Sequence, residues 1–224
     1  MNPVKRQRSP RVRKKREQMR HEILTVARDI LLQEGAEGVT LNAVSGRLDM
    51  TKPALYHYFS SKEALARSLV MTLIDEEIDA LMRAVDEVES DANLLGAMIR
   101  AFHAHYSNRL HAFRFVYGQS QLYTVPEFGI DADMIRHEIT PRTRRLFEQL
   151  EARLTDSTMS AERRHSVRRL AFVAWTSALG LVTMLGIADA THDPLLHSDE
   201  VLIDTLAKVF DTQVVHDMEG KGSH

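Results

Sequence analysis

Four side chains close together in the sequence could make hydrogen bonds and contacts with a nucleic acid. Lys52 and Tyr56 are four residues apart and would share one side of a helix, with Ala54 and His57 on its flanks. Lys52 can donate to guanine O6 and N7 or to a phosphate, and Ala54 is small enough to touch a thymine methyl. Tyr56 and His57 can contact a phosphate or a base edge. These residue types at this spacing predict a helix that enters the DNA major groove.

Each of these residues taken singly also has a simpler interpretation. A lysine on an exposed helix is usually only solvated, and Tyr56 could pack on a neighbouring helix. The DNA interpretation therefore depends on the elements that would hold the helix from behind.

The expected recognition helix is short and has an apolar inner side. Leu55 and Phe59 are four residues apart and would face inward. Thr51 is placed to cap the helix, and Pro53 is tolerated in the first turn, where no amide partner is lost. Asp49 and Met50 would form the turn before it. A helix held in this way leaves Lys52, Tyr56 and His57 outside.

The helices on either side begin with residues suited to binding phosphate. Thr40 is a plausible N-cap of a helix whose inward face is Leu41, Val44 and Leu48. Lys62 lies at the start of the helix that follows, which Ser61 would cap. Because helix N-termini attract phosphate, Thr40 and Lys62 are expected to clamp the DNA backbone.

Residues 20–70 resemble the DNA-binding module of the tetracycline-repressor (TetR) family. The resemblance is carried by the following residues: Gly35-Ala36-Glu37-Gly38-Val39-Thr40, Thr51, Leu55-Tyr56, Phe59, Ser61-Lys62-Glu63 and Leu65. Where the family usually has Gly-Val-Ser at the turn, this chain has Asp49-Met50-Thr51. Asp tolerates a left-handed conformation better than most residues but less well than Gly.

The resemblance implies a cytoplasmic, ligand-responsive transcriptional regulator that binds a palindromic operator as a homodimer. Repression of transcription is expected in preference to activation. In such regulators the C-terminal helices form the dimer and enclose a ligand pocket. The residues expected to contact DNA are Thr40, Thr51, Lys52, Ala54, Tyr56, His57 and Lys62.

Charge is distributed unevenly along the chain. The net charge of the 224 residues is −2, yet residues 1–20 contain nine basic residues and one acidic residue. A basic arm on an acidic body indicates a polyanion bound at one end, although a solubilising tail is the alternative. The arm lacks an apolar stretch and does not resemble a signal peptide. The absence of cysteine excludes disulfides and thiolate metal sites, and it fits a cytoplasmic location.

Helical periodicity continues throughout the chain and predicts an all-α fold. We expect a disordered basic arm (1–16), a helix-turn-helix DNA-binding domain (17–65), a helical ligand-binding and dimerisation domain (66–216) and a disordered tail (217–224).

Residues 170–188 are uncharged and long enough to span a bilayer. Thr176, Ser177 and Thr183 add polarity, and a helix apolar on all sides can instead lie at the centre of a protein or of a subunit interface. We expect this helix and the helix that Ser198 would cap to form a dimer interface with their copies. We do not expect the protein to bind a membrane. A membrane-anchored regulator is the alternative.

The expected ligand pocket is lined by apolar and amphipathic side chains from the middle helices. The candidates are Met98, Phe102, Tyr106, Tyr117, Tyr123 and Trp175. Such a cavity would suit an apolar or aromatic small molecule, and Tyr106 and Trp175 each offer a polar group. The alternative for each residue is an ordinary place in the core.

Metal binding and catalysis find little support. His103 and His105 are two residues apart and would point to nearly opposite sides of a helix, and His111 lies further along. No catalytic triad, phosphate-binding glycine loop or nucleotide motif is visible. We expect no metal, no cofactor and no enzyme. The competing hypothesis is a helical small-molecule carrier or enzyme with a vestigial DNA-binding head.

Overall fold

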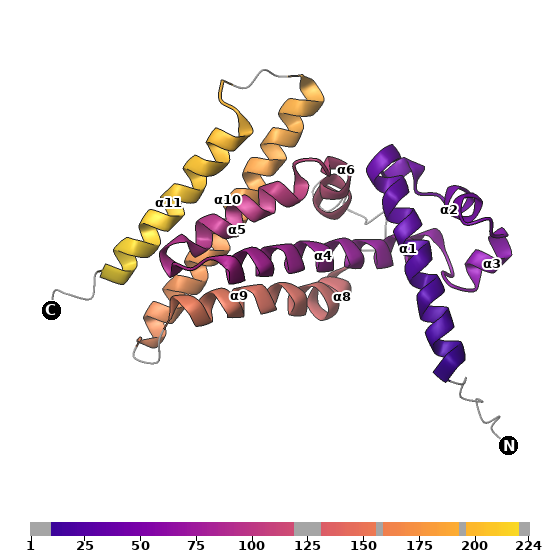
Figure 1. Cartoon of the computed structure of the whole chain (residues 1–224), viewed down its shortest axis with the longest axis horizontal. Coiled ribbons are helices and arrows are strands. Elements are labelled where there is room, and N and C mark those ends of the chain that lie inside the picture. The colour runs from indigo at the N-terminus through magenta and orange to yellow at the C-terminus, as the bar shows by residue number, and fades with distance from the viewer. Residues whose placement is uncertain (1–9, 119–130, 156–158, 193–195, 220–224) are drawn as a thin grey trace. The chain divides into compact units, whose positions relative to one another are not determined.

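The computed structural model describes residues 10–118, 131–155, 159–192 and 196–219. Every element in these ranges is a helix, so the prediction of an all-α protein is confirmed (Figure 1). The chain divides into two compact units. One comprises Met1–Leu73 and His111–Asp131, and the other comprises Ile74–Leu110 and Ala132–His224. The division falls within helix α4 (Lys62–Glu87).

The first helix, α1 (Pro10–Gly38), begins earlier than expected. Residues 10–16 were predicted to belong to a disordered arm, and the structure places them in this helix instead. Arg and Lys are good helix formers, and proline is favoured at the first helical position, so a basic segment that starts at Pro10 extends the helix. Gly35 has φ 75°, a value that glycine adopts readily, and it interrupts the helical path of α1.

The N-terminal unit is completed by short helices. α2 (Leu41–Arg47) and α3 (Lys52–Tyr56) follow α1, and α2 packs against both of them (Figure 1). α6 (Leu110–Phe113) and the π-helical turn η2 (Arg114–Gly118) belong to the same unit. The core of the unit includes Ile23, Ala27, Ile30 and Leu31, which lie at helical spacing on α1.

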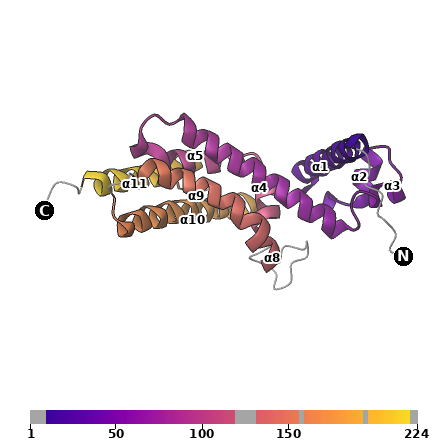
Figure 2. The same cartoon turned by 90° about the horizontal axis from the view of Figure 1, so that it is seen from below.

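The second unit consists of longer helices. Its elements are η1 (Asp91–Asn93), α5 (Leu94–Tyr106), α8 (Ala132–Met134), η3 (Ile135–Ile139), α9 (Thr140–Leu154), α10 (Ala161–Thr191) and α11 (Asp199–Glu219). α5 packs against α10 and α11, and α10 also packs against α9 (Figures 1 and 2). α11 continues to Glu219, so residues 217–219 are helical where a disordered tail was expected.

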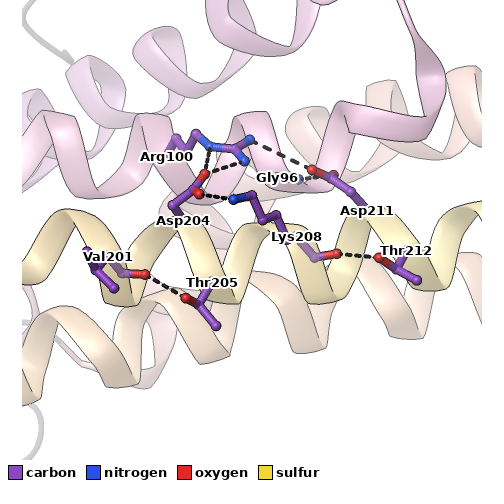
Figure 3. Close-up of polar contacts among 8 residues, drawn as sticks. All are labelled: Gly96, Arg100, Val201, Asp204, Thr205, Lys208, Asp211 and Thr212. Atoms are coloured by element: carbon purple, nitrogen blue, oxygen red, sulfur yellow. Dashed lines mark hydrogen bonds and ion pairs between the residues drawn. The ribbon is translucent and has the colours of Figure 1, made fainter. Parts of the chain in front are cut away.

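Polar contacts join α5 to α11 along one side (Figure 3). Asp204 of α11 accepts from Arg100 of α5 at 2.9 Å and from Lys208 of its own helix at 2.6 Å. Asp211 lies within reach of the same guanidinium, 3.7 Å from Nη1, and accepts from the backbone N–H of Gly96. These contacts fix the position of α11 along α5.

Apolar side chains remain exposed on α10 and α11. The large ones are Phe172, Val173, Met184, Ile187, Val201 and Val209. By length and composition α10 could cross a membrane. Only 28% of its most apolar window is buried within the chain, so the chain itself leaves most of this window uncovered. Most of this helix face therefore needs another cover, either from a second protein surface or from a bilayer.

Candidate nucleic-acid interface

α3 is held by the two apolar residues that its sequence predicts. Leu55 is completely buried and Phe59 is 1% exposed. Val44 of α2 and Val39, which precedes it, are buried in the same unit. This apolar inner side fixes which face of α3 is left for solvent.

The predicted caps of the helix-turn-helix are confirmed. The Thr40 hydroxyl accepts from the Ala43 amide at 3.0 Å, and the Thr51 hydroxyl accepts from the Ala54 amide at 3.4 Å. A threonine hydroxyl that accepts one hydrogen bond can still donate its own proton. Both residues therefore shape the helix starts and retain a donor for a phosphate.

The turn between α2 and α3 uses a left-handed residue. Asp49 has φ 52°, the conformation in which the resembling family usually has glycine. Its amide and that of Met50 donate to the carbonyls of Gly46 and Ser45, at 3.3 Å and 2.9 Å. Asp is one of the few non-glycine residues that adopt this conformation readily, so the altered turn sequence keeps the turn.

The outer side of α3 carries the residues predicted to read DNA. Lys52 and His57 are exposed, and Tyr56 is 47% exposed although it is large and aromatic. Ala54 is half-buried beside them, and Lys62 is half-buried in the first turn of α4. Lys52, Tyr56 and His57 are thus open to solvent on α3, and contacts of the predicted residues with DNA stay a prediction.

Two arginines of α1 hold the end of α3, and sequence reasoning missed this role. Arg16 Nη2 donates to the carbonyl of His57 at 3.0 Å, and Arg20 donates to the carbonyl of Tyr58. The Arg20 guanidinium also lies 4.1 Å from the centre of the Phe59 ring, a cation–π distance. Cations at the C-terminal carbonyls of a helix are favourable. The two arginines are four residues apart in the sequence. A count of basic residues does not reveal this spacing.

A groove of about 500 Å³ lies between the N-terminal part of α1, near Lys15, and α3. Lys15 and Arg16 lie on one side of it, and Ala54 and His57 lie on the other. The early start of α1 thus brings basic side chains beside the residues predicted to reach the bases.

The other unit contains a cavity of about 670 Å³ with largely apolar walls. Trp175 lines it together with Phe147 and Phe172. Tyr106 lines a second cavity of about 360 Å³, and its hydroxyl donates to the buried carboxylate of Glu77 at 2.6 Å. Tyr106 has therefore found the polar partner that a buried tyrosine requires.

The remaining candidates for ligand binding lie elsewhere. Met98 and Phe102 are fully buried and line neither of these two cavities. Tyr117 is half-buried in the N-terminal unit, with its ring 5.3 Å from that of Phe113. Tyr123 lies outside the described residues. Ligand contact by any of the six candidates stays a prediction.

Histidines of α5 make other interactions in place of a metal site. His103 Nε2 lies 3.2 Å from Asp199 Oδ2. His105 Nε2 lies 3.4 Å from Arg109 Nη1. Burial, and next to it the Arg109 charge, lowers the pKa of His105 to about 4. Within the described residues no three metal-binding side chains come together.

Comparison with known proteins identifies the DNA-binding part. Residues 23–69 match the sequence model of "Bacterial regulatory proteins, tetR family". Over 77 residues the chain is 34% identical to the HTH-type transcriptional regulator Rv1816 of Mycobacterium tuberculosis, a stretch that covers 34% of this chain and 33% of that protein. The chain thus matches about a third of the length of this curated relative. These matches confirm the resemblance of this part of the chain to the DNA-binding module of the TetR family.

Solved structures share the fold over most of the chain. The regulatory protein SCO4313 is 22% identical, with a TM-score of 0.66 over 90% of this chain and 98% of its own. A TetR variant of Acinetobacter baumannii, solved in complex with minocycline, is 18% identical, with a TM-score of 0.56 over 90% of this chain and 97% of its own. These likenesses confirm an N-terminal helix-turn-helix followed by a helical C-terminal domain.

Proposed function

We propose that the protein is a DNA-binding transcriptional regulator of the tetR family and acts as a repressor. The observation that carries the proposal is the outer face of α3, where Lys52 and Tyr56 are exposed while Leu55 and Phe59 hold the helix from behind. Polar and aromatic groups on a short, firmly held helix suit the major groove. Repression follows from occupancy, because a protein seated on a promoter blocks polymerase without any further contact.

We assign DNA reading to residues 17–65 and ligand binding and dimerisation to residues 66–216. The exposed side chains of Met184 and Ile187 on α10 and of Val201 and Val209 on α11 support a dimer in which these helices meet their copies. A twofold-symmetric dimer places two recognition helices on related half-sites, so the operator would be palindromic. A dimer interface also supplies the cover that α10 lacks within one chain.

Response to a small molecule is the third part of the proposal. The cavity beside Trp175 has a volume typical of ligand sites and largely apolar walls. A neighbour of the same fold was solved with minocycline, which shows that this architecture can hold a drug-sized molecule. An apolar or aromatic effector would fit the cavity of this chain, and its binding would change the affinity for DNA.

The test is a fluorescence anisotropy titration with DNA from the region upstream of the protein's own coding sequence. Lys52→Ala and Tyr56→Ala should each weaken specific binding by roughly tenfold or more, as expected for lost contacts to base edges. Arg169→Ala is the matched control, because it removes one positive charge from an exposed residue of the other unit. Unchanged binding in both α3 variants would refute the assignment of α3 as the reading helix.

Two alternatives give different outcomes in simple experiments. A carrier or enzyme with a vestigial head is favoured by the cavity alone. It predicts ligand binding or turnover with no preference for any DNA sequence. A membrane-anchored regulator is favoured by the length and composition of α10. It predicts that the protein sediments with membranes and needs detergent for release, whereas a dimer stays in the supernatant.

A further inference from the structure

The cavity of about 670 Å³ has an unusual wall. It lies between η3 with α9 and the facing side of α10, and Ile135 and Ile139 at the two ends of η3 line it. η3 is a π-helical turn. Such turns are rare in proteins, and those that occur are often found at functional sites. The volume lies within the range of small-molecule sites, about 300–1,000 Å³.

Three aromatic rings lie close together in the wall of this cavity. Phe147 of α9 lies 6.3 Å from Trp175 at an interplanar angle of 90°, and 6.1 Å from Phe172. Phe172 and Trp175, both of α10, are 6.0 Å apart. All three rings line the cavity, Phe172 is 52% exposed, and Phe147 and Trp175 are partly exposed. Aromatic walls set at different angles can hold a flat ring by stacking on one face and edge contact on another.

The chain around the cavity is positively charged. Residues 132–175 contain nine arginines and six acidic residues, although the whole protein carries a net charge of −2. Arg168 lines the cavity and donates through Nε to Glu151 at 2.9 Å. Arg144 also lines the cavity and has no hydrogen bond or ion pair with any residue that the structure describes. Its guanidinium is available for a ligand.

We propose that this cavity binds a small aromatic carboxylic acid. The rings of the ligand lie among Phe147, Phe172 and Trp175, and its carboxylate pairs with Arg144. That ligand binding changes the affinity for DNA rests on the proposed function. The binding itself depends only on the second unit. A planar carboxylate matches the two-pronged donor geometry of arginine.

The charges at the cavity select the acid over its neutral and cationic relatives. A neutral aromatic molecule would use the same walls and leave Arg144 unpaired, and an aromatic amine would face a like charge. Glu148 also lines the cavity, four residues after Arg144 on α9, and its negative charge disfavours a bound anion. The two side chains therefore have opposite effects on binding of an anion.

The test uses naphthoate and its neutral isostere naphthamide on the full-length protein. Isothermal titration calorimetry gives the affinities. Trp175 is the only tryptophan, so its side-chain N–H gives a single indole resonance in a nitrogen-15 correlation spectrum, and a shift of that resonance locates the bound ring. Naphthoate should bind about tenfold more tightly than naphthamide, the effect of one charge-assisted hydrogen bond.

Four variants separate the charge from the walls. Arg144→Gln should abolish the preference for naphthoate over naphthamide, and Glu148→Gln should increase it. Arg145→Gln is the matched control, because Arg145 is an exposed neighbour on α9 that does not line the cavity. Phe147→Leu keeps apolar volume and removes the ring, so it should weaken both probes by a similar factor of several-fold.

Two outcomes would overturn the proposal. Equal affinities of the wild-type protein for the two probes would remove the role of the acid group. Saturable binding that leaves the Trp175 resonance unmoved, or no saturable binding of either probe, would remove the site. Anisotropy with DNA is measured on the same samples. Absence of sequence-specific DNA binding by the wild-type protein would refute the proposed function as a regulator. It would not affect the conclusion about naphthoate binding, so the two failures are distinguishable.

Discussion

Asp211 of α11 accepts a hydrogen bond from the backbone N–H of Gly96 in the first turn of α5, with 2.7 Å between Oδ1 and N (Figure 3). The first-turn amides of a helix have no partner within the helix, and here a side chain 115 positions away supplies one. A Cβ atom on residue 96 would lie only 2.1 Å from Asp211 Oδ2. A methyl group on residue 96 would therefore displace the Asp211 carboxylate from the first turn of α5.

Gly96→Ala should destabilise the protein. The added methyl group forces Asp211 to move and to give up its hydrogen bond, which we expect to lower the free energy of unfolding by about 2 kcal/mol. Thermal and urea denaturation measure the loss. Gly46→Ala is the control, because a Cβ there meets nothing within 4 Å, and alanine should stabilise that helix slightly. A Gly96→Ala protein as stable as the Gly46→Ala protein would contradict the clash with the Asp211 carboxylate.

A double-mutant cycle assigns the loss to this pair. In an Asp211→Ala background the carboxylate is gone, so Gly96→Ala should cost much less than it does alone. Equal costs in both backgrounds would place the strain elsewhere.

His105 should make stability depend on pH. Its pKa falls from 6.5 to about 4 in the folded protein, chiefly through burial and then through Arg109, with Glu76 opposing. Between pH 4 and 6.5 the unfolded chain therefore binds more protons at this residue, so the free energy of unfolding rises with pH across that window. Because the side chain is only partly buried, we expect a contribution of roughly 1 kcal/mol.

His105→Gln removes this titration and keeps a polar side chain that can accept from Arg109. The pH dependence of the melting temperature between pH 4 and 6.5 should be flatter in this variant than in the wild type. His165→Gln, at an exposed position of α10, should leave the slope as it was. An unchanged slope in the His105 variant would show that another group controls acid stability.

Arg20→Leu tests the link between α1 and α3. Leucine keeps an apolar contact with Phe59 but cannot donate to the Tyr58 carbonyl, so the N-terminal unit should lose roughly 1 kcal/mol of stability. The position of α3 should loosen, and the ratio of specific to non-specific DNA affinity should fall by several-fold.

The matched control for Arg20 is Arg13→Leu, which removes the same charge from an exposed position of α1. Loss of a charge alone weakens binding to all DNA sequences about equally and leaves the specificity ratio unchanged. Identical behaviour of the two variants would mean that Arg20 contributes only charge.

Ile187→Asp tests the proposed dimer. Ile187 is 50% exposed on α10, and a carboxylate at a buried interface costs several kcal/mol, so the dimer should weaken by about a hundredfold or more. Size-exclusion chromatography with light scattering should show a wild-type mass of twice 25.5 kDa and a variant mass near 25.5 kDa. Leu196→Asp is the control, because Leu196 is 90% exposed and precedes α11. A monomeric wild-type protein would refute the interface.

The sequence by itself determined most of the helices and which face of α3 turns inward. Leu55 and Phe59 are inward because they are four residues apart on one short helix, and Thr40 and Thr51 cap because their partners lie three residues ahead. These relations involve neighbours in the chain, so spacing alone reveals them. Local propensity was nevertheless underestimated at the N-terminus, where the basic segment forms a helix from Pro10 onward.

Only the tertiary structure decided which distant residues meet. Arg20 finds the end of α3, Asp211 finds the first turn of α5, and Phe147 meets Trp175 across two helices. Each pair joins segments separated by many residues, and helix periodicity sets a side chain's face but leaves its partner open. Packing of whole helices selects that partner, because the contact forms only when two buried faces already fit together.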